Sequence, residues 1–218
     1  MQPIIVLIFI ALFIAILVLS YMANKKHREA IKAVAVRLGL NFSPEKSRTI
    51  ARRYEYINRI RNGRDRYAYN ILEGTYRGYP VQAFDYHYKT GSGKNTHHYY
   101  FSFYIHHLPI SVPELKIGPE GFFSKIAQAI GYDDIDFESH EFSSKFCVRS
   151  GSKKFAYDIC HSQMIEYLLA NPDLTIEMER STLAISFSGR MKPEKIEYNL
   201  KRLTDIRTLI PEYVLNRS

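Results

Sequence analysis

An uncharged run of apolar side chains near the N-terminus constrains this chain more than any other feature of its sequence. Residues 4–22 read IIVLIFIALFIAILVLSYM. In a helix, these nineteen residues rise about 28 Å at about 1.5 Å each, close to the hydrocarbon thickness of a bilayer. A cleaved signal peptide has a basic start and a shorter apolar region, whereas only Met1, Gln2 and Pro3 precede this run. The run therefore predicts an uncleaved transmembrane anchor formed by residues 1–23.

Positive charges follow the apolar run at once and predict its orientation. Lys25, Lys26 and Arg28 lie on its C-terminal side, and no charged side chain lies on the other side. By the positive-inside rule, the N-terminus is expected outside and the rest of the chain in the cytoplasm. We therefore expect a single-pass protein of the cell (inner) membrane. In the cytoplasm its two cysteines, Cys147 and Cys160, would remain reduced.

The excess positive charge of the chain is concentrated next to the anchor. Residues 24–66 carry thirteen Lys or Arg side chains and four acidic ones, whereas residues 67–218 are nearly neutral. Anionic lipid headgroups attract such juxtamembrane segments, so this one is expected to contact anionic lipid or a protein partner. The side chains expected at that contact are Lys25, Lys26, Arg28, Arg48, Arg52, Arg53 and Arg59.

Helical spacing is the dominant pattern in this basic segment. Apolar residues at intervals of three and four stop at Gly39, which predicts a helix over residues 27–38. Ser43-Pro44 is typical of a helix N-terminus and predicts a second helix over residues 44–58. The segment is therefore expected to be mainly helical, with its basic faces outward.

Strands and helices are expected to alternate in groups along the rest of the chain. Aromatic-rich runs at residues 67–76, 79–88 and 97–107, separated by short turns, predict an antiparallel meander. Further extended pieces are expected at 112–117, 134–138 and 144–149. Helices are expected from Pro119 to Gly131, over 153–170 with a break near Ser162, and from Pro193 to Ile210. A hairpin is expected in which 174–179 pairs with 182–188 around Arg180.

This order of elements predicts an α+β fold: a transmembrane helix followed by a mainly antiparallel sheet packed with several helices. Residues 67–218 would form the cytoplasmic α+β domain. Because the basic segment has apolar faces of its own, residues 24–218 are expected to fold as one unit.

Several stretches of the sequence are distinctive: NILEGTYRGYPVQAFDYHYKTGSGK at residues 70–94, DIDFES and EFS within 134–143, and LGLNF at 38–42. They resemble a family of small bacterial and archaeal proteins that carry no assigned activity and are membrane-anchored or soluble. The resemblance implies a single domain of shared architecture. It implies no catalytic residue.

Two motifs that suggest ligand sites fail on their spacing. TGSGKN at residues 90–95 lacks the first glycine of a phosphate-binding loop and the hydroxyl residue after Lys94, and a strand pattern follows it. The acidic run at residues 133–138 lacks the glycine and the final glutamate of a calcium loop. We expect a glycine-rich hairpin tip at the first motif, and no cofactor at either.

Two other function classes stay open as alternatives. Asp85 and His87, with a histidine across the predicted hairpin, suggest a metal shell, and hence a membrane-tethered hydrolase or metal-dependent enzyme. Eleven of the seventeen tyrosines lie from Tyr54 to Tyr104, close to the basic segment, and aromatic strands beside Arg and Lys can stack nucleobases. That pattern suggests a tethered nucleic-acid binder, although no RNA-binding motif supports it.

Taken together, these features favour a non-enzymatic protein. Residues 4–22 would hold a binding or scaffolding domain close to the inner leaflet, where its partner is lipid or another protein.

The predicted orientation can be tested directly. If Lys25, Lys26 and Arg28 set the topology, a reporter that works only in the cytoplasm should be active when fused after Ser218. A reporter that works only outside the cytoplasm should be inactive at the same position. Paired reporters that are active either in the cytoplasm or outside it would measure this. Activity of the external reporter alone would contradict both the location and the reduced state of the cysteines.

Overall fold

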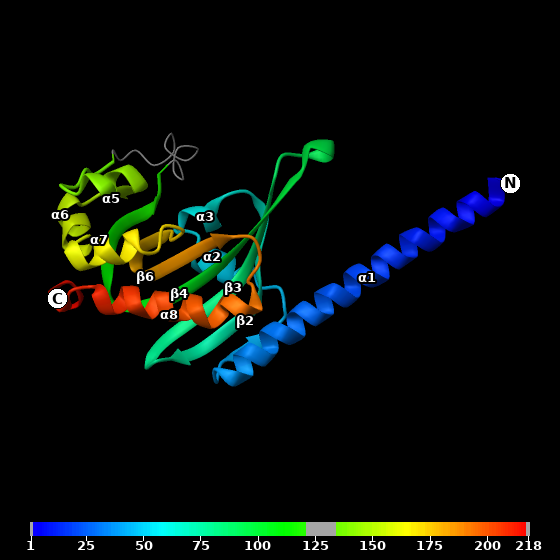
Figure 1. Cartoon of the computed structure of the whole chain (residues 1–218), viewed down its shortest axis with the longest axis horizontal. Helices are drawn as coiled ribbons and strands as arrows, with labels where there is room; N and C mark the ends of the chain where they lie inside the picture. The colour runs from blue at the N-terminus through cyan, green and yellow to red at the C-terminus, as the bar shows by residue number, and fades with distance from the viewer. Residues whose placement is uncertain (1, 121–133, 217–218) are drawn as a thin grey trace.

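One long helix begins the computed structural model, which describes residues 2–120 and 134–216. This helix, α1 (Gln2–Arg37), joins the anchor and the predicted 27–38 helix into one element, because no proline or glycine interrupts it after Pro3. Of the helices in the described residues, α1 is the one long and apolar enough to cross a membrane. Its large apolar side chains from Ile5 to Met22 are half or more exposed, and this part projects away from the rest of the molecule (Figure 1).

A six-stranded antiparallel sheet forms the centre of the structure, as the sequence predicted. Its strands run in the order β1-β2-β3-β4-β5, and β6 pairs with β4. They are β1 (Asn41–Ser43), β2 (Arg64–Tyr76), β3 (Tyr79–Thr90), β4 (His97–Pro119), β5 (Phe146–Ser150) and β6 (Ile176–Ser188). The tip between β3 and β4 is the short helix η1 (Gly93–Asn95), so the predicted glycine-rich hairpin is confirmed.

Strand β4 is 23 residues long and absorbs the two extended pieces predicted at 97–107 and 112–117. Its first half pairs with β3, its last five residues pair with β5, and β6 pairs along its other edge. The register against β6 shifts between His107 and Leu115, where Pro109 and Pro113 each remove a backbone donor. The long strand is therefore continuous but irregular at its centre.

Three sequence predictions were wrong in detail. The hairpin predicted around Arg180 is instead the single strand β6, in which Arg180 adopts a φ of 53° at one of these irregularities. The predicted 44–58 helix consists of two short helices, α2 (Arg48–Arg53) and α3 (Asn58–Arg61). Helix α2 begins at Arg48, later than the predicted start at residue 44, because the Ser47 hydroxyl caps it by accepting the Ile50 N–H at 3.2 Å. Residues 134–137 form no strand, although the Ile135 N–H donates to the Val148 carbonyl at 2.9 Å.

The remaining helices follow the predicted pattern more closely. The predicted break near Ser162 is confirmed, and the predicted Pro119–Gly131 helix lies largely outside the described residues, with β4 ending at Pro119. The helices are α5 (His140–Lys145), which the sequence did not predict, α6 (Lys153–Ile159), α7 (Ser162–Leu169), η2 (Pro193–Lys195), α8 (Ile196–Leu209) and α9 (Glu212–Leu215).

The two faces of the sheet carry separate hydrophobic cores. One face packs against the end of α1, α8 and the helices of the α5–α7 region, and includes Leu72, Ala83 and Tyr104. The opposite face packs against α2 and α3, and includes Phe84 and Phe103. Alternation along each strand produces this division, since neighbouring residues point to opposite faces.

The last turns of α1 belong to the first core. Ile31 and Ala35 are fully buried there, whereas Val36 on the other side of the helix is 71% exposed. An ion pair of 2.5 Å between Arg37 Nη1 and Glu197 Oε2 of α8 adds little, because both side chains are largely exposed. Apolar burial therefore holds the last turns of α1 against the sheet.

We expect Ile31→Ala to destabilise the whole fold. The change leaves a cavity in a packed core and should lower the free energy of unfolding by about 2–4 kcal/mol. Val36→Ala, on the exposed side of the same helix, should change it by less than about 0.5 kcal/mol. Urea unfolding of the full chain in mild detergent, followed by circular dichroism, measures both. Equal midpoints for the two variants would contradict the docking of α1.

Candidate functional site

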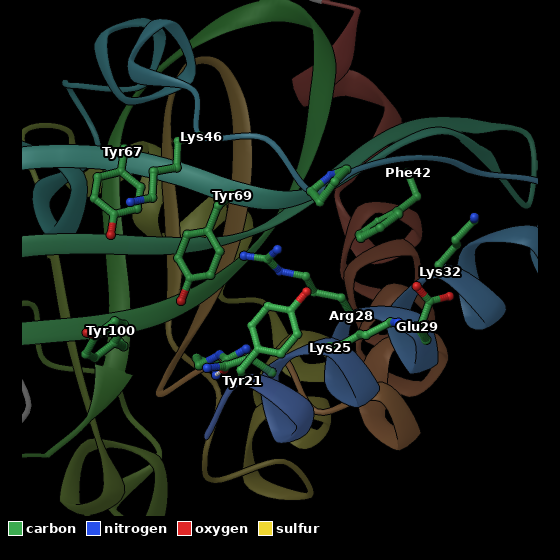
Figure 2. Close-up of a pocket in the computed structure, with 13 residues that line it drawn as sticks. Tyr21, Lys25, Arg28, Glu29, Lys32, Phe42, Lys46, Tyr67, Tyr69 and Tyr100 are labelled. Carbon is green, nitrogen blue, oxygen red and sulfur yellow. Dashed lines mark hydrogen bonds between the residues drawn. The ribbon is translucent and has the colours of Figure 1, made fainter. Parts of the chain in front are cut away.

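A cleft of about 870 Å³ lies between α1 and the polar end of the sheet (Figure 2). Its side chains come from α1, from β1 and the loop after it, from β2 and β4, and from the segment between β6 and η2. They comprise five cations, four tyrosines and four others: Lys25, Arg28, Lys32, Lys46 and Arg190; Tyr21, Tyr67, Tyr69 and Tyr100; and Asn24, Glu29, Phe42 and Pro44.

The helical period explains the contribution of α1. Six of its residues between Tyr21 and Lys32 line the cleft, at intervals of one, three or four positions. Such intervals bring side chains to one face of a helix. Further along α1, Ile31 and Ala35 enter the core, so docking of the helix also positions the cleft. Tyr21 lies at the end of the apolar run, which places the cleft beside the point where that run stops.

The pairing register brings the tyrosines of the sheet together. Tyr67 lies opposite His87 on β3, and His87 lies opposite Tyr100 on β4. Tyr69 is two residues along β2 and lies opposite Asp85. Tyr67 and Tyr69 have ring centroids 5.7 Å apart, so the two rings form a continuous aromatic surface along this wall of the cleft. Figure 2 shows these rings on the sheet side, with the α1 side chains across from them.

Positive charge predominates in the cleft. Glu29 is the one carboxylate among the side chains that line it. Within residues 2–120 and 134–216, no ion pair joins any of the five cations to a carboxylate. Lys46 Nζ instead lies 4.6 Å from the centre of the Tyr67 ring, a cation–π contact. The cleft therefore combines unneutralised cations with aromatic rings, an arrangement that favours an anionic ligand.

A buried carboxylate positions Arg190 in this cleft. Asp85 is fully buried; its Oδ2 accepts from the Asn70 amide at 2.8 Å and its Oδ1 from the Met191 N–H at 2.5 Å. These bonds hold the segment after β6 against the sheet. The neighbouring Arg190 donates from Nη1 to Asn24 Oδ1 on α1, at 2.9 Å. Asp85 is therefore a positioning residue that links β3, the β6–η2 segment and α1.

The structure separates the basic residues that the sequence grouped together. Lys25 and Arg28 line the cleft, and Lys26 is exposed on α1 outside its lining. The α2 residues Arg48, Arg52 and Arg53 are also exposed, but α2 packs on the opposite face of the sheet. One basic segment thus supplies two separate surfaces.

Arg59 does not belong to either exposed surface. Its side chain is only 7% exposed, donates from Nη1 to Ser186 Oγ at 3.2 Å and lies 4.8 Å from the centre of the Phe101 ring. Burial lowers the pKa of Arg59 to about 10, and the nearby Glu177 opposes this shift. The expected contact of Arg59 with lipid or a partner is therefore corrected, because its guanidinium packs inside the protein.

Lys46, Arg190 and three sheet tyrosines were not predicted as site residues. The signals that the sequence offered were that Lys46 lies within the basic segment and that the tyrosines follow it closely. Arg190 had none, because it is 166 residues from Asn24 in sequence and reaches the cleft only through the fold.

The Asp85–His87 region does not assemble a metal shell. His87 Nε2 lies 3.0 Å from His98 Nδ1, but both oxygens of Asp85 already accept hydrogen bonds. Among the described residues, no group of three or more His, Cys, Asp or Glu side chains is placed to hold a metal ion. The geometry gives Asp85 a structural role, and it lends no support to the enzyme alternative.

The structure is that of an α+β protein with an N-terminal helix suited to a membrane, and most of its fold has a counterpart among solved structures. The chain is similar to the mycobacterial trehalose monomycolate transport factor A, TtfA, with a TM-score of 0.60. The similarity covers 84% of this chain and 96% of the other, at 13% sequence identity, and therefore concerns the fold alone. No protein-family model matches the sequence, and no curated protein matches it.

Titration of Asp85 should make stability depend on pH. Burial raises the pKa of Asp85 to about 6, from an ordinary value of 3.8, although its hydrogen bonds from Met191 and Asn70 oppose the shift. Because its pKa is raised, Asp85 contributes stability to the fold that is fully present below its ordinary pKa of 3.8 and is lost as the pH rises through about 6. Between about pH 4 and pH 7 this group should therefore cost the wild type about 3 kcal/mol of unfolding free energy.

Asp85→Asn removes this titration and keeps an acceptor for the Met191 N–H. The Asn70 side-chain oxygen is buried without a partner in the described structure, so a turned Asn70 amide can accept from the new amide. The unfolding free energy of Asp85→Asn, relative to that of wild type, should therefore rise by about 3 kcal/mol between about pH 4 and pH 7. Urea unfolding in detergent at several pH values measures it, with the exposed Asp136→Asn as control. A difference that does not change with pH would contradict the assignment.

Proposed function

We propose that this chain is a single-pass inner-membrane protein whose cytoplasmic domain holds the anionic polar head of an amphiphile in the α1 cleft, without catalysing a reaction. The observation that carries the proposal is the placement of five unneutralised cations and four tyrosines beside the end of the apolar run. A lipid headgroup bound in the cleft would lie beside the end of the membrane helix and hence next to the bilayer, so the acyl chains of the lipid need not leave the membrane.

The chemistry of the cleft suits such a head. Anionic lipid attracts each Lys or Arg near the surface by about 1 kcal/mol, and the attraction fades within a Debye length of about 8 Å. Arg28 and Arg190 offer planar guanidinium groups, which bind phosphate or carboxylate through paired hydrogen bonds. The tyrosines add ring faces and hydroxyl groups, which suit the boundary between apolar and polar parts of a ligand.

The structural comparison supports the proposal only by analogy. TtfA is named as a transport factor for trehalose monomycolate. From that name we take only the general idea that a domain of this fold can act in the transport of an amphiphile. The identity of the ligand here rests on the charge and the rings of the cleft.

The proposal is tested with the full chain in zwitterionic detergent, titrated with a short-chain phosphatidylglycerol and with the matching phosphatidylcholine. We expect the anionic lipid to bind more tightly, and high salt to weaken its binding. Lys25→Gln with Arg28→Gln removes two charges from the cleft and should weaken binding about 30-fold, from about 1 kcal/mol for each charge. Tyrosine fluorescence or thermophoresis provides the binding curve.

The matched control removes two charges from the other face. Arg52→Gln with Arg53→Gln changes the net charge equally, on α2, and should alter affinity by less than about twofold. Equal weakening by both double variants would show a diffuse charge effect and contradict a specific cleft. Tighter binding of an oligonucleotide, lost in the Lys25 and Arg28 variant, would favour the nucleic-acid alternative instead.

A further inference from the structure

A second, smaller cavity lies on the same face of the sheet and shares Arg190 with the cleft. It has a volume of about 170 Å³, is partly open to solvent, and is lined by residues of β4, the end of β6, the segment leading to η2 and α8, and by Asp173. Pockets for drug-sized ligands measure about 300–1,000 Å³, so this cavity suits only a small group.

Three buried polar atoms at this cavity form no hydrogen bond of good geometry with the described residues, although the Asn199 side chain lies close to the Tyr104 hydroxyl. They are the hydroxyl of Tyr104, Oδ1 of Asn199 and Nε of Arg202. Tyr104 is fully buried, Arg202 is 3% exposed and Asn199 is 6% exposed. An unsatisfied buried polar group destabilises a fold, and buried polar groups in proteins almost always have a partner. Three at one cavity form an arrangement that a small ligand with several acceptor atoms would satisfy.

These groups can all donate to an anion. Burial raises the pKa of Tyr104, although the nearby Asn199 side chain opposes the shift, so the hydroxyl keeps its proton. Arg202 Nε always carries a proton. A half-turn of the Asn199 amide presents its NH₂ group in place of its oxygen.

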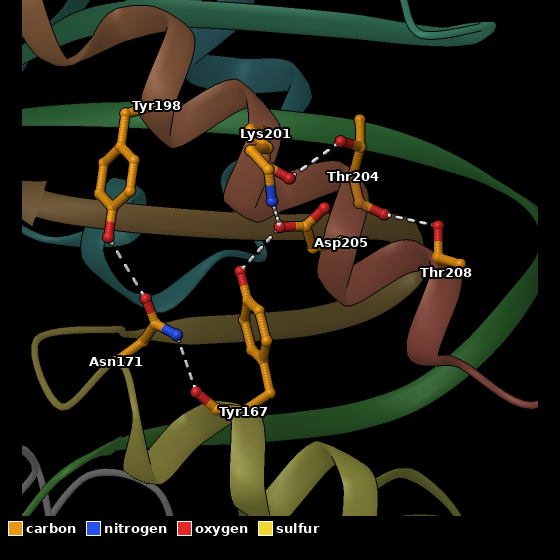
Figure 3. A network of polar contacts seen from close by, with 7 residues as sticks. All are labelled: Tyr167, Asn171, Tyr198, Lys201, Thr204, Asp205 and Thr208. Carbon is orange, nitrogen blue, oxygen red and sulfur yellow. Dashed lines mark hydrogen bonds and ion pairs between the residues drawn. The ribbon is translucent and has the colours of Figure 1, made fainter.

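Arg202 is held in a fixed orientation. Its Nη2 and Nη1 donate to the two oxygens of Asp173 at 2.6 and 3.1 Å, which leaves Nε for another partner. Its guanidinium also lies 5.2 Å from the centre of the Tyr198 ring. The Tyr198 hydroxyl in turn donates to Asn171 Oδ1 at 3.4 Å, within the polar network between α7 and α8 (Figure 3).

The charge around the cavity also favours an anion. Arg190, Lys192 and Lys195 line it together with Arg202, against the single carboxylate of Asp173, which Arg202 neutralises. Three positive charges remain. We propose that this cavity binds a phosphate group, either as free phosphate or as the phosphate of a lipid head, through Tyr104, Asn199, Arg202 and Lys195. The site is distinct from the α1 cleft and does not depend on its proposed function.

The test measures thermal unfolding of the full chain in detergent, with increasing inorganic phosphate at constant ionic strength. We expect the melting temperature to rise and to saturate with phosphate, but not with chloride. Tyr104→Phe removes one hydroxyl that forms no hydrogen bond of good geometry in the described structure and lies close to Asn199, so the variant should be nearly as stable as wild type without phosphate. Its apparent phosphate affinity should fall at least about fivefold, because a hydrogen bond to a charged group is lost.

A matched pair of lysines supplies the control. Lys195→Gln at the cavity should weaken phosphate binding, whereas Lys201→Gln, which removes the same charge from α8 where Lys201 pairs with Asp205, should not. A short-chain phosphatidic acid tested in parallel distinguishes the two sources of phosphate, and a response to either one supports the site. No response to either ligand, or equal responses in wild type and Tyr104→Phe, would overturn the proposal.

One further variant separates this site from the cleft. Lys25→Gln with Arg28→Gln should leave the phosphate response intact. If that response disappeared in the double variant and persisted in Tyr104→Phe, phosphate would bind in the cleft and the second site would be refuted.

Discussion

The structure depends on one helix meeting two different environments without a break. Over its first part α1 exposes apolar side chains on all sides, and over its last turns it buries only one face, through Ile31 and Ala35. A helix that is apolar all round suits lipid, whereas one with a single apolar stripe suits the surface of a protein core. Because the helix is continuous, docking of the second part fixes where the first part leaves the sheet. The cleft results from this docking. The helix face that enters the core at Ile31 and Ala35 lies, just before that point, opposite the tyrosines of the sheet.

Arg190 and Asp85 connect this arrangement to the rest of the sheet. Asp85 on β3 binds the Met191 N–H, and Arg190 reaches Asn24 on α1, so a single short segment contacts the centre of the sheet and the helix. Arg190 also lines both the cleft and the smaller cavity beside α8. A buried carboxylate is costly, and the hydrogen bonds to both oxygens of Asp85 offset only part of that cost. Asp85 and Asn70 thus hold the segment that carries Arg190, on the sheet face that packs against α1.

The distribution of basic residues shows the difference between charge in sequence and charge in space. Residues 24–66 form a single positive block in the sequence, yet their course through α1, β1, α2 and α3 takes them to both faces of the sheet. Lys25 and Arg28 arrive at the cleft, Arg52 and Arg53 arrive on the opposite face, and Arg59 is buried. A local count of charge therefore predicted that a basic surface exists, but not where it lies.

The sequence by itself determined the properties that arise from local patterns. The apolar run, the stop at Gly39, the hairpin at residues 90–95 and the break near Ser162 are all short-range signals. The order of the helices and strands predicted from such signals gave the α+β class that the structure confirms. Only the tertiary structure decided that β4 and β6 are long and irregular, because Pro109, Pro113 and Arg180 are accommodated by pairing with partners far along the chain. The same holds for the two sites. Tyr69, Asp85, Arg190 and Asn24 are scattered over the sequence, and the pairing register and the docking of α1, both products of long-range packing, bring them together.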